Sequence, residues 1–155
     1  MAISKGADLA LLLLSGFHSM VDEVVVELAR RGHPGVRPVH EFALRAVDNG
    51  AATASELGRR LAVSKQAAAK TIDALEGFGY VERAGDPADA RRKQIRITAR
   101  GHELMSIGGA LFDDVRERWA AQIGSHELET LEAHLNQVVE RRPLGADDLV
   151  RDARA

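Results

Sequence analysis

The chain has 155 residues, 45% hydrophobic and 28% charged, with a formal net charge of −2, which favours a single domain and excludes a disordered chain. It has no cysteine, which excludes disulfides, thiolate metal sites and oxidant sensing through a thiol. Aromatic residues make up only 4% of the chain, which argues against a surface that stacks several nucleic-acid bases.

The first apolar segment is too short for a membrane span. The longest uninterrupted apolar run, Leu9 to Leu14, covers six residues, whereas about 20 are needed to cross a bilayer. Asp8 precedes this run, and no cleavage site with small residues follows it. We therefore expect neither a transmembrane helix nor a signal peptide, and we predict a cytoplasmic protein that does not engage a membrane.

Helical periodicity predicts four helices in the first half of the chain. The first runs over about 7–31 and ends at a Gly- and Pro-rich turn, because these residues are poor helix formers. The second begins at Pro38 and ends at Asn49-Gly50. Thr53 and Glu56 form a capping box that opens a short third helix. Ser64 is the N-cap of a longer fourth helix that runs to Phe78.

The period then changes from 3.6 to 2, which predicts two strands over about 80–83 and 94–98. The polar segment between them is too long for a tight turn and is expected to project as a flap. Thr98 caps a long helix to about Ile123, and Gly124-Ser125 starts a last helix that ends at Pro143.

This order of elements predicts a mainly α (α+β) fold: a winged helix-turn-helix with flanking helices and a two- to three-stranded wing sheet. We assign residues 34–101 to the winged helix-turn-helix, residues 1–33 and 102–142 to dimerisation helices, and residues 143–155 to a polar tail.

Candidate DNA-binding residues lie on the free face of the fourth helix and at the end of the flap. On the helix they are Ser64, Lys65, Gln66, Ala67, Ala69 and Lys70. Gln pairs with adenine, Lys reaches guanine or a phosphate, and an Ala methyl contacts thymine. The flap ends in Arg91, Arg92 and Lys93, where cations would lie along the minor groove or the backbone.

Local charge supports this interpretation. Residues 53–101 contain ten Lys or Arg and six Asp or Glu, a net charge of +4, and the rest of the chain carries −6. Such asymmetry is expected where one region meets phosphates and the rest does not.

The stretch from Thr53 to Gly101 resembles the multiple antibiotic resistance regulator (MarR) family. The motifs that carry the resemblance are Leu61-Ala62, Ser64, Leu75-Glu76-Gly77-Phe78-Gly79-Tyr80-Val81-Glu82-Arg83, Asp89-Ala90-Arg91 and Ile97-Thr98-Ala99-Arg100-Gly101. The resemblance implies a homodimer, formed by the first and last two helices, that binds a pseudo-palindromic operator, usually as a repressor. It implies that Arg91 enters the minor groove and that Asp89 braces the wing. Relatives often carry hydroxyl residues where Ala67 and Ala69 stand, which leaves base readout to Gln66, Lys65 and Lys70.

The resemblance also implies a small, often aromatic or phenolic, effector bound between the dimer helices and the winged region. The candidate polar groups for such a site are His18, Arg37 and His40. No cofactor is expected.

Four other interpretations stay open at this point. The winged helix could mediate protein association without reading DNA, and the apolar helices could pack on each other within one subunit. Zinc sensing through His126 and His134 lacks a third ligand. An enzyme is disfavoured, because His102-Glu103 and His126-Glu127 lack the second His of a metalloprotease motif and there is no phosphate-binding glycine loop.

Overall fold

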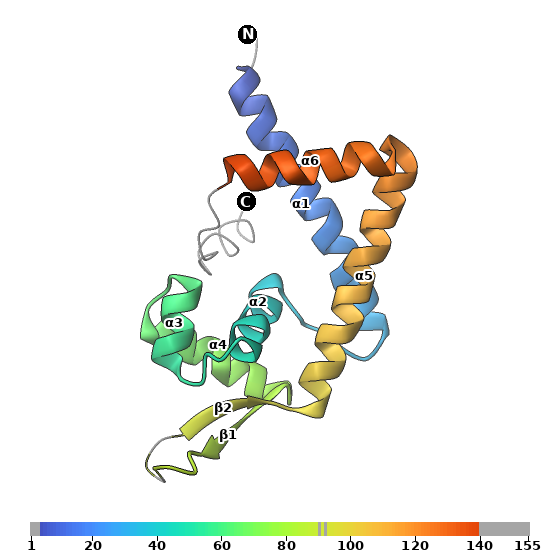
Figure 1. Ribbon diagram of the computed structural model, residues 1–155. Helices are drawn as coiled ribbons and strands as arrows, with labels where there is room; N and C mark the ends of the chain where they lie inside the picture. The colour runs from blue at the N-terminus through green and yellow to red at the C-terminus, as the bar shows by residue number, and fades with distance from the viewer. Residues whose placement is uncertain (1–3, 90, 92, 140–155) are drawn as a thin grey trace.

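A computed structural model describes residues 4–89, 91 and 93–139. The elements in chain order are α1 (Lys5–Arg30), α2 (Pro38–Asp48), α3 (Ala54–Leu61), α4 (Lys65–Gly77), β1 (Val81–Gly85), β2 (Lys93–Ile97), α5 (Ala99–Ile123) and α6 (Ser125–Val138). The mainly helical winged helix-turn-helix predicted from the sequence is confirmed. In Figure 1, α2, α3, α4 and the β1–β2 hairpin form a lower part, here called the head. The helix α5 rises beside it from the hairpin, and α1 and α6 lie above it; these three helices are called the base.

Four helices begin behind a hydroxyl side chain that accepts a backbone N–H. The Ser4, Thr53, Ser64 and Thr98 oxygens accept from the N–H three residues ahead, at 3.1, 3.2, 3.1 and 3.1 Å. Each such bond satisfies a donor that the helix itself leaves free. At α3 the Glu56 carboxylate also accepts from the N–H of Thr53, which completes the predicted capping box.

The described strands form a two-stranded antiparallel sheet, with Val81 opposite Ile97 and Gly85 opposite Lys93. Both predicted strands are present, but the first begins one residue later than predicted. The N–H of Tyr80 donates to the Leu75 carbonyl at 2.9 Å, so this residue closes the end of α4 instead of joining the ladder. One further hydrogen bond, from the N–H of Ile95 to the Ala52 carbonyl at 2.8 Å, ties the sheet to the segment before α3.

The core lies where the head meets the lower halves of α1 and α5. Its buried side chains come from every element of the head, and α1 and α5 complete it with Leu28 and Leu104. The Arg118 guanidinium of α5 donates to the Glu23 carboxylate of α1. The Arg116 guanidinium donates to both Glu132 oxygens at 2.7 and 2.9 Å, which fixes α6 against α5.

The upper part of the base leaves apolar side chains exposed. In α1, Leu9 is 57% and Leu12 is 70% exposed, whereas Val24 and Leu28 in its lower half are buried. In α6, Leu128 is buried but Leu131 and Val138 are 43% and 77% exposed. The apolar side chains of α1 and α6 are therefore only partly covered within one chain.

Helix α1 is long and apolar enough to cross a membrane when only length and composition are considered. An 18-residue window within it has a mean hydropathy of 1.7. The expectation drawn from the six-residue run missed this property, because Ser15 and Gly16 interrupt the run but barely lower the mean. Core helices of globular proteins meet the same criterion, and the lower end of α1 packs into the core through Val21, Val24 and Leu28.

Candidate nucleic-acid interface

The turn between α3 and α4 holds the two helices in helix-turn-helix geometry. Ala62 ends α3 in the left-handed region, with φ of 53°. The N–H of Val63 donates back to the Gly58 carbonyl at 2.9 Å. A Cβ on Gly58 would lie 3.0 Å from the Val63 carbonyl oxygen, so glycine allows the chain to pass closely here.

Helix α4 has one buried face and one open face. Ala68, Ile72 and Leu75 are buried against the head. At the start of the opposite face, Ser64, Lys65, Gln66 and Lys70 are exposed, whereas Ala67 and Ala69 are partly buried. The structure therefore brings all six predicted helix positions to one end of α4, with three long polar side chains that extend beyond two short ones.

The wing, which is the loop between β1 and β2, is shaped by two aspartates. Asp86 Oδ1 accepts from the N–H of Ala88 at 2.8 Å, and Asp89 Oδ1 accepts from the N–H of Arg91 at 3.0 Å. Both are side-chain turns of the kind that Asp favours. The Arg91 residue is exposed and Lys93 begins β2, while Arg92 lies outside the described residues.

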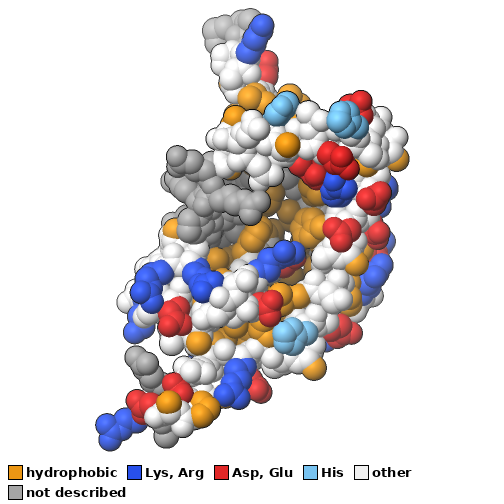
Figure 2. Space-filling view, in the orientation of Figure 1, with side chains coloured by type: hydrophobic (Ala, Val, Ile, Leu, Met, Phe, Trp, Pro, Cys, Tyr) orange, Lys and Arg blue, Asp and Glu red, His pale blue; other side chains and the backbone are white. Residues whose placement is uncertain are grey.

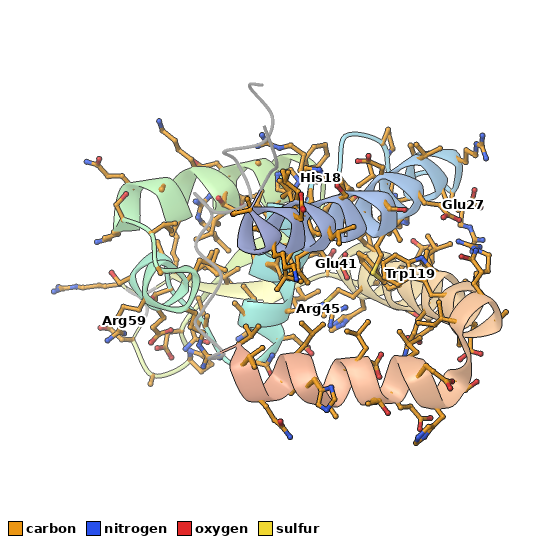
Figure 3. The ribbon with its side chains drawn as sticks, turned by 90° about the horizontal axis from the view of Figure 1, so that it is seen from above. His18, Glu27, Glu41, Arg45, Arg59 and Trp119 are labelled. Carbon is orange, nitrogen blue, oxygen red and sulfur yellow. The ribbon has the colours of Figure 1, made fainter. Side chains whose placement is uncertain are left out.

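Additional cations stand beside the predicted ones. Arg59 and Arg60 in the last turn of α3 are exposed, as is Arg96 on β2. Figure 2 shows Lys and Arg side chains gathered over α3 and at the hairpin, and Figure 3 shows Arg59 pointing outward from α3. Arg59, Arg60 and Arg96 contribute to the net charge of +4 but were not predicted as site residues. Cations on α3 could have been predicted as site residues, because the first helix of a helix-turn-helix crosses the DNA backbone.

An arginine on β1 joins the wing sheet to α4. The Arg83 guanidinium donates to Asp73 Oδ1 at 2.5 Å and to the Glu76 carboxylate. Hydrogen bonding to Asp73 is the main cause that raises the pKa of Arg83 above its ordinary value. In the sequence, Arg83 was identified only as part of a family motif, and its contacts were not predicted.

The head meets α5 at a close backbone contact. The Thr98 hydroxyl donates to the Gly79 carbonyl at 2.6 Å. A Cβ on Gly101 would lie 2.2 Å from the Tyr80 carbonyl oxygen and 2.7 Å from Ile97 Cγ2, so only glycine fits at this position. The predicted helix start at Thr98 is therefore also the joint between the wing sheet and the base.

Arg100 and His33 surround this joint. The Arg100 guanidinium donates to the Phe78 carbonyl at 3.2 Å and to the Gly32 carbonyl at 2.8 Å, and it lies 5.3 Å from the centre of the Tyr80 ring. His33 is buried, and its Nδ1 lies 3.1 Å from the Tyr80 hydroxyl. Burial, followed by the charge of Arg100, lowers the pKa of His33.

A cavity of about 250 Å³ lies between the head and the base. It is lined mainly by apolar side chains from α1, α2 and α5, among them Phe17, Met20, Phe42 and Phe112. Its polar lining residues are Arg37, Glu41 and Arg45. Arg45 Nη2 donates to Glu41 Oε1 at 2.9 Å, and Glu41 is only 8% exposed. Figure 3 labels this pair, which lies on α2.

Of the three predicted effector residues, only Arg37 lines this cavity. His18 is half-buried beside the Phe17 ring. His40 is buried, its Nδ1 accepts from the N–H of Arg37 at 3.1 Å, and its ring packs edge-on against Phe78. Burial, with a smaller contribution from Arg37, lowers the pKa of His40 to about 4, so the ring is neutral at pH 7 and caps α2.

Two polar residues of the cavity, Glu41 and Arg45, were not predicted, although the sequence carries a signal for them. Arg37, Glu41 and Arg45 follow one another at intervals of four, which places them on one face of α2. His18 and His40 were predicted from their residue type, whereas this spacing points to Glu41 and Arg45. No group of three metal-binding side chains occurs among the described residues.

Comparison with known proteins shows a similarity over the central part of the chain. Residues 35–92 match the model of the MarR family. This segment of the chain is similar to the MarR family. The transcriptional regulator HosA of Escherichia coli O111:H- is 33% identical over 66 residues, which are 43% of this chain and 49% of HosA, so the match spans about half of that relative.

Two solved structures share the fold of this protein over most of the chain. A mutant of MepR from S. aureus, solved bound to an oligodeoxyribonucleotide, has a TM-score of 0.57 and 21% identity, over 83% of this chain and 93% of that one. CouR from Rhodococcus jostii RHA1, solved bound to p-coumaroyl-CoA, has a TM-score of 0.64 and 20% identity, over 91% of this chain and 98% of CouR. The resemblance predicted from the sequence motifs is confirmed.

Proposed function

We propose that the protein is a sequence-specific, DNA-binding transcriptional regulator. The observation that carries the proposal is the joint exposure of Lys65, Gln66 and Lys70 at the open start of α4, in a region that has a net charge of +4. The wing brings Arg91 and Lys93 to the same head. Such an arrangement suits a helix in the major groove with cations along the adjacent backbone or minor groove.

The working form is a homodimer on a pseudo-palindromic operator, where it acts as a repressor. The exposed leucines of α1 and the exposed apolar residues of α6 support this assembly, because a second copy would cover them. Each covered Leu contributes about 2 kcal/mol. Two α4 helices would then reach successive major grooves, about 34 Å apart on one side of the duplex.

A small aromatic or phenolic effector is proposed to bind in the cavity and release the DNA. The apolar lining and the polar groups Arg37, Glu41 and Arg45 support a ligand with an aromatic body and one polar end. A ligand that binds one spacing of the two heads better than another shifts the dimer toward that spacing.

Catalysis is not part of the proposal, because the family is one of transcriptional regulators. We place the protein in the cytoplasm, where the DNA is, with the upper part of α1 covered by a second copy rather than by lipid.

The decisive experiment measures binding of the protein to its own upstream DNA by anisotropy across a series of salt concentrations. We expect log affinity to fall steeply as log salt rises, since several phosphates are neutralised per dimer. A band-shift of the same complex across a panel of phenolic metabolites then tests the effector. A flat salt response, or no binding at micromolar protein, contradicts the proposal and favours a module for protein association.

The substitution Arg91→Ala tests the wing. We expect it to weaken binding by about 1–3 kcal/mol, because a cation in a narrow minor groove is lost. Arg30→Ala is the matched control, since Arg30 is an exposed cation on α1, in the base. Equal effects of the two substitutions would contradict a specific role of the wing.

A further inference from the structure

Arg83 and its two carboxylate partners form a bridge from the wing sheet to α4 that the proposed function does not by itself require. Arg83 lies on β1, and Asp73 and Glu76 lie three residues apart on α4, which puts them on one side of the helix. One guanidinium donates to both of them. We call this set the Arg83 clamp.

The clamp lies in a place where its charges matter. The start of α4 carries Lys65 and Lys70, whereas its second half carries the carboxylates of Asp73 and Glu76. Two unpaired carboxylates on a helix that enters DNA would repel the phosphates. Arg83 offsets one of these two charges and holds both side chains against the sheet.

Stability alone explains the clamp poorly. The Asp73 side chain is 65% exposed, that of Glu76 is 40% exposed, and that of Arg83 is 32% exposed. Exposed ion pairs contribute little to the free energy of folding. A planar guanidinium that binds two carboxylates does, however, fix the relative orientation of the elements that carry them.

The clamp spans the corner at which the chain turns from α4 into β1. Between α4 and β1 the chain turns through Gly79, with φ of 78°, and the buried Tyr80. Arg83 follows three residues later, opposite Ile95 of β2, and the same strands continue to the wing. A change in the angle between the wing sheet and α4 must therefore break the bonds of Arg83.

We propose that Arg83 is a positioning residue for DNA recognition, which holds the wing and α4 at the one angle where both contact the same duplex. This inference rests on the proposed DNA binding. Positioning and a simple charge effect predict opposite changes in specific DNA affinity when the two carboxylates are neutralised.

The test neutralises the two carboxylates with Asp73→Asn and Glu76→Gln together. The double variant loses two negative charges from the head, so a charge effect alone would tighten all DNA binding. Positioning predicts the opposite for the specific duplex, with about fivefold weaker binding, while a scrambled duplex is bound as well as before or better. The specific duplex is one that the wild-type protein selects from a random pool.

Two further variants separate geometry from charge. Arg83→Lys keeps the net charge but replaces the fork by a point charge, and it is expected to lose specific binding by a similar factor. Glu82→Gln is the control, because Glu82 is an exposed neighbour on β1 outside the clamp. It removes one negative charge and is expected to leave the ratio of specific to non-specific affinity unchanged. Circular dichroism and thermal melting check that all variants fold.

The outcomes distinguish this inference from the proposed function. Wild-type affinity of Arg83→Lys for the specific duplex, or tighter specific binding by the double variant, overturns the positioning role while DNA binding stands. Direct contact of Arg83 with a phosphate would lead to tighter specific binding by the double variant. A wild-type protein that binds no duplex overturns both.

Discussion

The head buries its apolar side chains, whereas the upper base leaves many of its own exposed to solvent. In the head, Ala43, Leu44 and Leu57 have no exposed surface. In the upper base, Leu12 and Val138 keep 70% and 77% of theirs. The head, with the lower parts of α1 and α5, thus completes a core within one chain, whereas the upper base displays the kind of surface that proteins bury against a partner. The difference separates the part proposed to recognise DNA from the part proposed to assemble the dimer.

The largest expected effect comes from a charge placed in the upper base. Leu12→Asp puts a carboxylate where the proposed dimer buries a leucine, once in each subunit. We expect the dimer to weaken by about 3 kcal/mol or more for each copy, because an unpaired charge is buried. Sedimentation at micromolar concentration measures this change.

Leu12→Met is the matched control, since it conserves volume and apolar character. Retention of the dimer by Leu12→Asp would contradict the assembly surface. A wild-type species at the chain mass of 16.8 kDa would contradict the homodimer itself.

A second prediction concerns the joint between head and base. Gly101→Ala introduces a Cβ 2.2 Å from the Tyr80 carbonyl oxygen. The backbone must shift, so we expect the free energy of unfolding to fall by about 2–3 kcal/mol in urea titrations.

Gly109→Ala, on the same helix, is the control with the opposite sign. A Cβ there meets nothing within 4 Å, and alanine in a helix is about 0.5–1 kcal/mol more favourable than glycine. Equal responses of the two glycines would contradict the close contact at Gly101.

A third prediction is the pH dependence contributed by His40. Its pKa is about 4 in the folded state and 6.5 when unperturbed. Between these values the unfolded chain binds a proton that the folded chain does not, so stability falls as pH is lowered from 6.5 to 4. At 1.36 kcal/mol per pKa unit, the loss is about 3 kcal/mol.

Urea titrations of the wild type and His40→Gln across this pH range isolate the effect. We expect the stability of the wild type relative to His40→Gln to decline over the window, since glutamine retains an acceptor for the N–H of Arg37 but does not titrate. Parallel curves for the two proteins would show that His40 titrates alike in the folded and unfolded chain.

The smallest effect is expected at the helix-turn-helix. Ala62 adopts the left-handed region, with φ of 53°, which costs an L-residue about 1–2 kcal/mol. Ala62→Gly removes this cost but raises the entropy of the unfolded chain, so we expect a gain of about 0.5 kcal/mol in thermal unfolding. Ala62→Val should have the opposite sign, because a β-branched residue tolerates this region poorly. A loss of stability in the glycine variant would contradict the strain at this turn.

Local interactions in this protein were predictable from the sequence, and long-range ones were not. The caps at Thr53, Ser64 and Thr98 link residues three apart, so a short window contains both partners. The start of β1 was misplaced by one residue, because the N–H of Tyr80 is taken by the end of α4.

The candidate site shows the same limit. The exposed start of α4 follows from helical periodicity, but the partners of Arg83 lie seven and ten residues away across a corner. His40 has the residue type of a ligand group, yet its position behind Arg37 makes it a buried cap. Residue type alone cannot distinguish the two roles, which depend on what packs against the ring.

The bonds of Arg100 bear on how the molecule unfolds. This side chain of α5 is bound to carbonyls of Phe78 in the head and of Gly32 after α1, the latter 68 residues away in sequence. The boundary assigned at residue 101 passes directly through this junction. Separating the head from the base would break it and would strip Leu104 from the core. The surfaces proposed for recognition and for assembly therefore differ, but we expect the two parts to unfold in one cooperative transition.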